Sequence, residues 1–232
     1  MNAYPDFSYV AKLIAEPARA AILNGLMDGS SLPAGELAYR ASVSAPTISS
    51  HLAKLVEGGL ITVHQQGRHR YFKIADASVA EILEKLGTLA PPVQVRSLRQ
   101  SEELKRVRRA RTCYDHLAGE LGVGLAESLV KRNMIILENG EYAVTEPGKE
   151  LFSRWGIRLE EARVKRRVFA KACLDWSERR FHISGWLGAA MATRFFELGW
   201  IERVDGSRAV RLTEAGKAAL REDLGYVETI RI

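Results

Sequence analysis

The amino-acid sequence predicts a mainly helical chain of the α+β class, divided into two domains. Three observations carry this prediction. Residues 6–57 contain short segments whose apolar residues recur at helical spacing. Two β-rich segments, 60–65 and 69–74, flank a glycine and predict a hairpin. Beyond residue 100 the chain repeats itself, so we expect two copies of one unit there.

The composition is that of an ordinary globular protein, with 232 residues of which 47% are hydrophobic. The net charge of +6 falls within residues 91–232, because the first 90 residues carry eight basic and eight acidic side chains. A basic balance permits nucleic-acid binding but does not establish it. Two cysteines, no apolar run of membrane-spanning length and no leader pattern lead us to expect a cytoplasmic protein without a disulfide framework.

The N-terminal elements begin with a short helix at 6–14. The segment "EPARAAILNGLMDG" predicts a second helix, because Pro17 suits its first turn and Gly29 lies just past its end. A third, short helix is expected at 34–41. The segment "SVSAPTISSHLAKLVEGG" gives the clearest helix of the chain, with a serine cap at its start and two glycines at its end.

The fourth helix has two distinct faces, one apolar and one polar. Ile48, Leu52, Leu55 and Val56 form the apolar face that we expect to be buried. The hairpin that follows carries basic side chains at its tip. Short helices, a strongly capped helix and a basic hairpin together predict a winged helix-turn-helix, in which the capped helix enters the major groove and the hairpin contacts the flanking DNA. The residues expected to contact DNA are Ser44, Thr47, Ser49, Ser50, His51, Lys54, Arg68, His69, Arg70 and Tyr71.

The first 90 residues resemble the DNA-binding domain of ArsR-type transcriptional repressors. The resemblance rests on "EPARAAIL" at 16–23, on "SAPTISSHLAKL" at 44–55 and on "GLITVHQQGRHRYFKI" at 59–74, and it covers roughly residues 8–88. It implies a dimer that binds a palindromic operator and leaves it when an effector binds. A winged helix used only for protein contacts is the alternative.

Two usual metal sites of this family have no counterpart here. The resemblance implies ligands on the short helix or on the helix after the wing. Neither "PAGELAYRA" at 33–41 nor "DASVAEILEKLG" at 76–87 contains cysteine or histidine. An effector site would therefore lie in the additional C-terminal part. This part makes the chain a long form of the family that it resembles.

The paired prolines of "TLAPPVQVRS" predict a boundary that separates a DNA-binding domain at 1–92 from a second domain at 93–232. Within the second domain, "HLAGELGVGLAESLVKRNMI" at 116–135 aligns without a gap to "HISGWLGAAMATRFFELGWI" at 182–201. We therefore expect two winged-helix-like α-α-β-β-α repeats, at about 101–156 and 157–225. Their glycine-rich helix starts suit close packing, so a sensor or dimerisation domain is favoured over a second DNA reader.

Each copy also contains a cysteine, an aspartate and a histidine. If Cys113 and His116 lie on one helix, they share a face and could bind a soft or borderline metal. Three roles stay open for these sets: structural packing, a site for an organic or reactive effector, and a metal site, which is not favoured. The candidate residues are Cys113, Asp115, His116, Cys173, Asp175 and His182.

The expected function is that of a sequence-specific DNA-binding transcriptional regulator. We expect a dimeric repressor that binds operator DNA and a small-molecule effector. No membrane partner is expected. The alternative is a thiol- or metal-responsive scaffold whose winged helix mainly serves protein contacts. No catalytic motif such as G-x-S-x-G, a P-loop or H-E-x-x-H occurs, so no enzyme is predicted.

Overall fold

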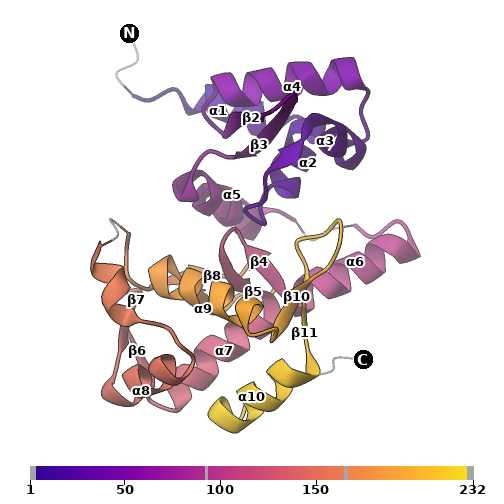
Figure 1. Cartoon of the computed structure of the whole chain (residues 1–232). Coiled ribbons are helices and arrows are strands. Elements are labelled where there is room, and N and C mark those ends of the chain that lie inside the picture. The colour runs from indigo at the N-terminus through magenta and orange to yellow at the C-terminus, as the bar shows by residue number, and fades with distance from the viewer. Residues whose placement is uncertain (1–3, 92–93, 165–166, 229–232) are drawn as a thin grey trace. The chain divides into compact units, whose positions relative to one another are not determined.

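The computed structural model describes residues 4–91, 94–164 and 167–228, and the chain forms two compact units (Figure 1). The first covers residues 1–83 and the second residues 84–232. No helix of the described residues is both long and apolar enough to cross a membrane.

The first unit contains the predicted helices and hairpin in the predicted order. The helices are α1 (Phe7–Ile14), α2 (Pro17–Gly25), α3 (Ala34–Ala41) and α4 (Ala45–Glu57). The hairpin of β2 (Ile61–Gln66) and β3 (His69–Ile74) runs in register from Ile61 opposite Ile74 to Gln66 opposite His69. A two-residue strand, β1 (Leu32–Pro33), adds to the outer side of β3 and was not expected from the sequence.

The division between the units falls inside α5 (Ala77–Leu89), whereas the sequence places it after residue 92. The second half of this helix is held by the C-terminal unit. Glu84 forms an ion pair with Arg208, and the carbonyl oxygen of Thr88 accepts a hydrogen bond of 2.6 Å from Arg179. The prolines at 91 and 92 therefore follow the boundary rather than mark it.

The C-terminal unit contains two copies of one series of elements. The first is α6 (Leu98–Arg109), β4 (Arg111–Cys113), β5 (His116–Ala118), α7 (Gly119–Lys131), β6 (Ile135–Glu138), β7 (Glu141–Val144) and α8 (Glu146–Arg154). The second is the 3₁₀ helix η1 (Leu159–Val164), β8 (Lys171–Leu174), β9 (Phe181–Ser184), α9 (Gly185–Glu197), β10 (Ile201–Arg203), β11 (Val210–Leu212) and α10 (Glu214–Leu224). The first copy has the expected α-α-β-β-α order with an added hairpin after its first helix, and the second copy differs from it by beginning with a 3₁₀ helix.

The two repeats exchange strand contacts reciprocally. The second hairpin of the first repeat pairs with β8, with Glu141 opposite Lys171, to give a sheet of order β6-β7-β8-β9. In the other direction, Ala209 beside β11 forms a bridge with Arg111 of β4. Glu141 and Lys171 of one contact thus correspond by position to Ala209 and Arg111 of the other.

Backbone hydrogen bonds follow the same symmetry. Tyr142 donates to the carbonyl of Ala170 at 3.0 Å, and its counterpart Val210 donates to the carbonyl of Ala110 at 3.0 Å. This pattern relates the repeats by an approximate twofold axis, so neither repeat completes its sheets alone.

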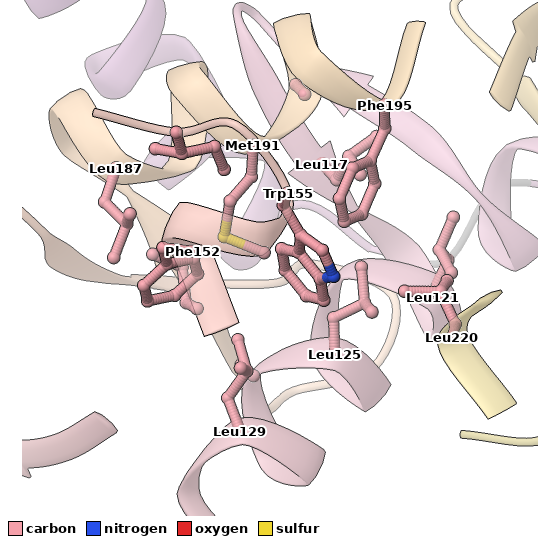
Figure 2. Close-up of a cluster of buried hydrophobic side chains, with 14 of the residues drawn as sticks. Leu117, Leu121, Leu125, Leu129, Phe152, Trp155, Leu187, Met191, Phe195 and Leu220 are labelled. Carbon is pink, nitrogen blue, oxygen red and sulfur yellow. The ribbon is translucent and has the colours of Figure 1, made fainter. Parts of the chain in front are cut away.

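The core of this unit lies between the repeats. Trp155 is surrounded by leucines of α7 and by aromatic and aliphatic side chains of α8 and α9 (Figure 2). Its ring lies edge-on to Phe195 and Trp200, at centroid distances of 5.2 and 5.8 Å. Trp186 of the second copy also belongs to this core and Trp200 packs against it, which is the common role of such side chains.

Candidate DNA-binding surface and cysteine–histidine cluster

Helix α4 presents a short polar surface. The Ser44 hydroxyl caps the helix by accepting from the Thr47 amide at 3.5 Å, and it also bonds the Thr47 hydroxyl at 2.8 Å. Ile48 and Leu52 are buried, which turns the opposite face outward. The exposed residues of this helix include Thr47, Ser49, Ser50 and Lys54, as expected. We call Ser44 together with these four residues the α4 surface.

His51 is placed differently from the expectation that it faces DNA. Its side chain is only 15% exposed, and its Nδ1 atom lies 3.3 Å from a carboxylate oxygen of Glu16. Glu16 also caps α2 by accepting a hydrogen bond of 2.9 Å from the Arg19 amide. His51 therefore connects α4 to the start of α2, because its position one turn above Thr47 lies at the edge of the buried face.

The wing hairpin places its basic residues at an exposed tip. Arg68, His69 and Arg70 surround a Gly67 turn and are all exposed. Gly67 has a φ of +59°, a conformation that a glycine adopts without strain. Tyr71 is half-buried and stacks on His64 with ring centroids 5.6 Å apart. Tyr71 thus supports the wing from behind.

The cysteine and histidine of each repeat lie opposite each other on two strands. Cys113 of β4 pairs with His116 of β5, and Cys173 of β8 pairs with His182 of β9. Cys113 and His116 therefore do not lie on one helix, which was the condition for the shared helical face considered from the sequence. Tyr114 adopts a left-handed conformation with φ of +62°, which closes a two-residue turn where a helix would have continued.

The twofold relation brings the two pairs together. One ligand atom from each of Cys113, His116, Cys173 and His182 lies within 4.8 Å of all the others. The two imidazole rings are 5.1 Å apart between centroids. Three of the four side chains are buried and Cys173 is partly buried. We call these four residues the Cys–His cluster.

The two aspartates of the sets lie behind the histidines instead of in the cluster. An Asp115 carboxylate oxygen lies 3.1 Å from Nδ1 of His116, and the other pairs with Arg167 at 2.5 Å. Sequence reasoning did not single out Arg167, because no local pattern connects it to Asp115, which lies 52 residues earlier in the chain. Asp115 thus connects the cluster to the segment that precedes β8.

Asp175 is held more completely than Asp115. It forms a fully buried ion pair of 2.9 Å with Arg111 and accepts a hydrogen bond of 2.7 Å from the Gly119 amide. One of its oxygens lies 3.5 Å from Nδ1 of His182. The Arg111 guanidinium also lies over the ring of Trp176, 4.5 Å from its centroid.

The charges of these groups follow from their partners. Burial opposes ionisation of Asp115, but the hydrogen bonds from His116 and Arg167 lower the pKa of its carboxyl to about 2. Burial would lower the pKa of His116, yet the Asp115 carboxylate raises it to about 9. The hydrogen bond between the thiols lowers the pKa of Cys173 and raises that of Cys113, so the pair shares one proton.

Two glycines allow the repeats to approach at the cluster. A Cβ atom added at Gly122 would lie 2.4 Å from the Leu117 carbonyl oxygen and 3.5 Å from the His182 Cβ. A Cβ atom at Gly188 would lie 2.3 Å from the Ile183 carbonyl oxygen and 3.1 Å from the His116 Cβ. The glycines that the alignment pairs thus have the same role in both copies.

Comparison with known proteins agrees with the first unit. Residues 14–64 match a family described as a helix-turn-helix domain. Over 220 residues the chain is 47% identical to the HTH-type transcriptional regulator YdfF of Bacillus subtilis (strain 168). This alignment covers 95% of this chain and 97% of YdfF. It is 28% identical to the arsenical resistance operon repressor of Staphylococcus aureus over 37% of this chain and 82% of that protein.

Among solved structures, HlyU from Vibrio cholerae N16961 is 29% identical and covers 35% of this chain and 88% of its own, with a TM-score of 0.33. The match to YdfF extends over both units, so the C-terminal repeats are shared with a regulator of the same length class. This chain therefore belongs to the ArsR-type family of helix-turn-helix transcriptional regulators.

Proposed function

We propose that this regulator binds a palindromic operator as a homodimer, with the α4 surface in the major groove and the wing on the flanking backbone. The observation that carries the proposal is the pairing of a hydroxyl-rich helix start with an exposed basic hairpin tip. Short hydroxyl side chains reach phosphates and base edges closely, and a helix N-terminus favours phosphate. Arg68 and Arg70 supply charge for the backbone.

Exposed apolar side chains support the dimer. Ile82, Leu86 and Leu89 are exposed and follow each other at i, i+4 and i+7, so they form one stripe along α5. Phe7 on α1 is 75% exposed as well. Apolar stripes of this kind in a water-exposed helix are typical of contact surfaces. A second copy of the chain is the partner that a palindromic operator requires.

We further propose that the C-terminal unit senses an effector whose binding releases the operator. The regulator acts in the cytoplasm, where the operator lies, and carries out no catalytic step. Support for the sensing role comes from the separate compact C-terminal unit and from the convergence of its reactive side chains.

The operator proposal is tested with the double variant Arg68→Ala/Arg70→Ala. Affinity for DNA from the regulator's own promoter region should fall, and the slope of log affinity against log salt should decrease by about 2, since two phosphate contacts are lost. Sedimentation of the wild-type complex should give two chains per operator. The measurements are fluorescence anisotropy at several salt concentrations and footprinting.

The matched control is Arg211→Ala/Arg221→Ala, which removes the same charge from exposed positions of the C-terminal unit. It should leave the salt slope unchanged. An unchanged slope in the wing variant would refute the assigned DNA surface. A missing footprint for the wild-type protein would favour the alternative in which the winged helix contacts protein.

A further inference from the structure

We propose that the Cys–His cluster binds one zinc-class divalent cation in a tetrahedral site that joins the two repeats. Cys113 and His116 come from the first repeat, and Cys173 and His182 from the second. Two thiolates and two imidazoles are the donor set that zinc prefers in proteins. The site does not depend on the operator proposal, because all its residues lie in the C-terminal unit.

The spacing of the ligand atoms suits such an ion. A tetrahedral ion with bonds of about 2.0–2.3 Å keeps its ligand atoms about 3.3–3.8 Å apart. The four ligand atoms already lie within 4.8 Å of one another. Side-chain rotations of a small size therefore close the site, and the backbone hairpins can stay in place.

The imidazole nitrogens supply the second argument. Among the described residues, Nε2 of His116 and both ring nitrogens of His182 have no hydrogen-bond partner, although all three atoms are buried. A buried polar atom without a partner costs roughly 1–3 kcal/mol. Two such atoms directed into one cluster are explained when both bind the same cation.

The carboxylates behind the cluster supply the third argument. In each repeat Nδ1 of the histidine faces an aspartate, at 3.1 Å for Asp115 and 3.5 Å for Asp175. A metal-binding histidine commonly directs its second ring nitrogen to a carboxylate, which fixes the ring and leaves the other nitrogen for the metal. In the first repeat this contact is a hydrogen bond, whereas Nδ1 of His182 lies near Asp175 without forming one.

One metal ion would use all four ligand atoms of the cluster, which lie within 4.8 Å of one another. A disulfide between Cys113 and Cys173 would use both sulfurs but leave the two Nε2 atoms unpaired, so it accounts for fewer of the observations.

The test loads the full chain, purified under reducing conditions, with Zn²⁺ or Co²⁺ and removes the excess by dialysis. Elemental analysis should give one equivalent of zinc per chain. The cobalt form should show thiolate-to-cobalt charge transfer and the intense visible bands of tetrahedral coordination. Cys173→Ser and His182→Gln should each reduce retained zinc at least tenfold. His64→Gln, at an exposed wing position, is the matched control and should retain one equivalent.

A second measurement keeps the test valid if a variant unfolds. Zinc should raise the thermal midpoint of the wild-type C-terminal unit, which the fluorescence of its tryptophans reports, and a chelator should reverse the rise. The proposal is overturned if the reduced wild-type chain retains less than about a tenth of an equivalent, or if cobalt gives an octahedral spectrum. Formation of a Cys113–Cys173 disulfide without metal retention in reducing buffer would overturn it as well.

Discussion

Asp115 and Asp175 hold the same position in the two repeats but have different surroundings. Asp115 is partly exposed and pairs with Arg167. Asp175 is buried with Arg111, and burial opposes its ionisation while Arg111 and the Gly119 amide lower the pKa of its carboxyl. One buried charge is thus neutralised by a second buried charge, an arrangement that is strongly destabilised when one partner is removed. Asp175 therefore has a structural role in addition to facing His182.

Gly188→Ala should destabilise the C-terminal unit. The new Cβ atom would lie 2.3 Å from the backbone oxygen of Ile183, which cannot move without shifting β9. Overpacking of this kind costs about 1–3 kcal/mol. Denaturant unfolding followed by tryptophan fluorescence measures the change, because Trp155, Trp176, Trp186 and Trp200 all belong to this unit.

The control for this variant is Gly87→Ala in α5. There the added Cβ atom would lie 3.7 Å from the Trp176 ring, at ordinary contact distance. Alanine favours the helix over glycine by up to about 1 kcal/mol, so this variant should be neutral or more stable. Equal stability of the Gly188 variant and the wild type would show that the close contact between α9 and β9 is wrong.

At the scale of the element, the sequence predicts helices better than short strands. The helices of the first unit have caps, proline at the first turn and apolar residues at regular spacing, and all these signals are local. The hairpin of β4 and β5 has strands of three residues, too short for an alternating pattern to be recognised. Cys113 and His116 are three residues apart, a spacing that fits a helix as well as a tight hairpin.

The alignment of the two copies nevertheless predicted part of the site. It paired Gly122 with Gly188 and His116 with His182, and the contacts of the glycines are equivalent in the structure. It could not show which side chains of each set point inward. That depends on the exchange of strand contacts between repeats, and on the ion pairs that hold Asp115 and Asp175, none of which leaves a local sequence pattern.

The threonine cap at the start of α10 gives a prediction at the scale of the element. The Thr213 hydroxyl accepts from the Gly216 amide at 3.1 Å and donates to the Gly199 carbonyl at 2.8 Å, and so it caps α10 and fixes the preceding turn. Thr213→Ala should cost about 1–2 kcal/mol, as other lost helix caps do. Thr213→Ser keeps the hydroxyl and should recover most of this loss in the same unfolding assay. Equal losses in both variants would contradict the capping role.

At the scale of the whole molecule, the chain combines a winged helix-turn-helix unit with a duplicated unit that is structurally distinct from it. Helix α5 belongs to both, because the division passes between Leu83 and Glu84. Its C-terminal half contacts Trp176, Arg179 and Arg208 of the second repeat. Trp176 and Arg179 lie between β8 and β9, and Arg208 precedes β11.

The duplicated unit should fold only as a whole. Each repeat supplies strand partners to the other, through Glu141 opposite Lys171 and Arg111 opposite Ala209, and both contribute to one core. A fragment of residues 98–157 should therefore show little tertiary structure. Residues 84–232 should unfold in one cooperative transition, since the repeats lose their shared core together. Near-ultraviolet circular dichroism and thermal unfolding distinguish the two outcomes. Cooperative unfolding of the 98–157 fragment would mean that the reciprocal strand contacts are dispensable and that the repeats are independent domains.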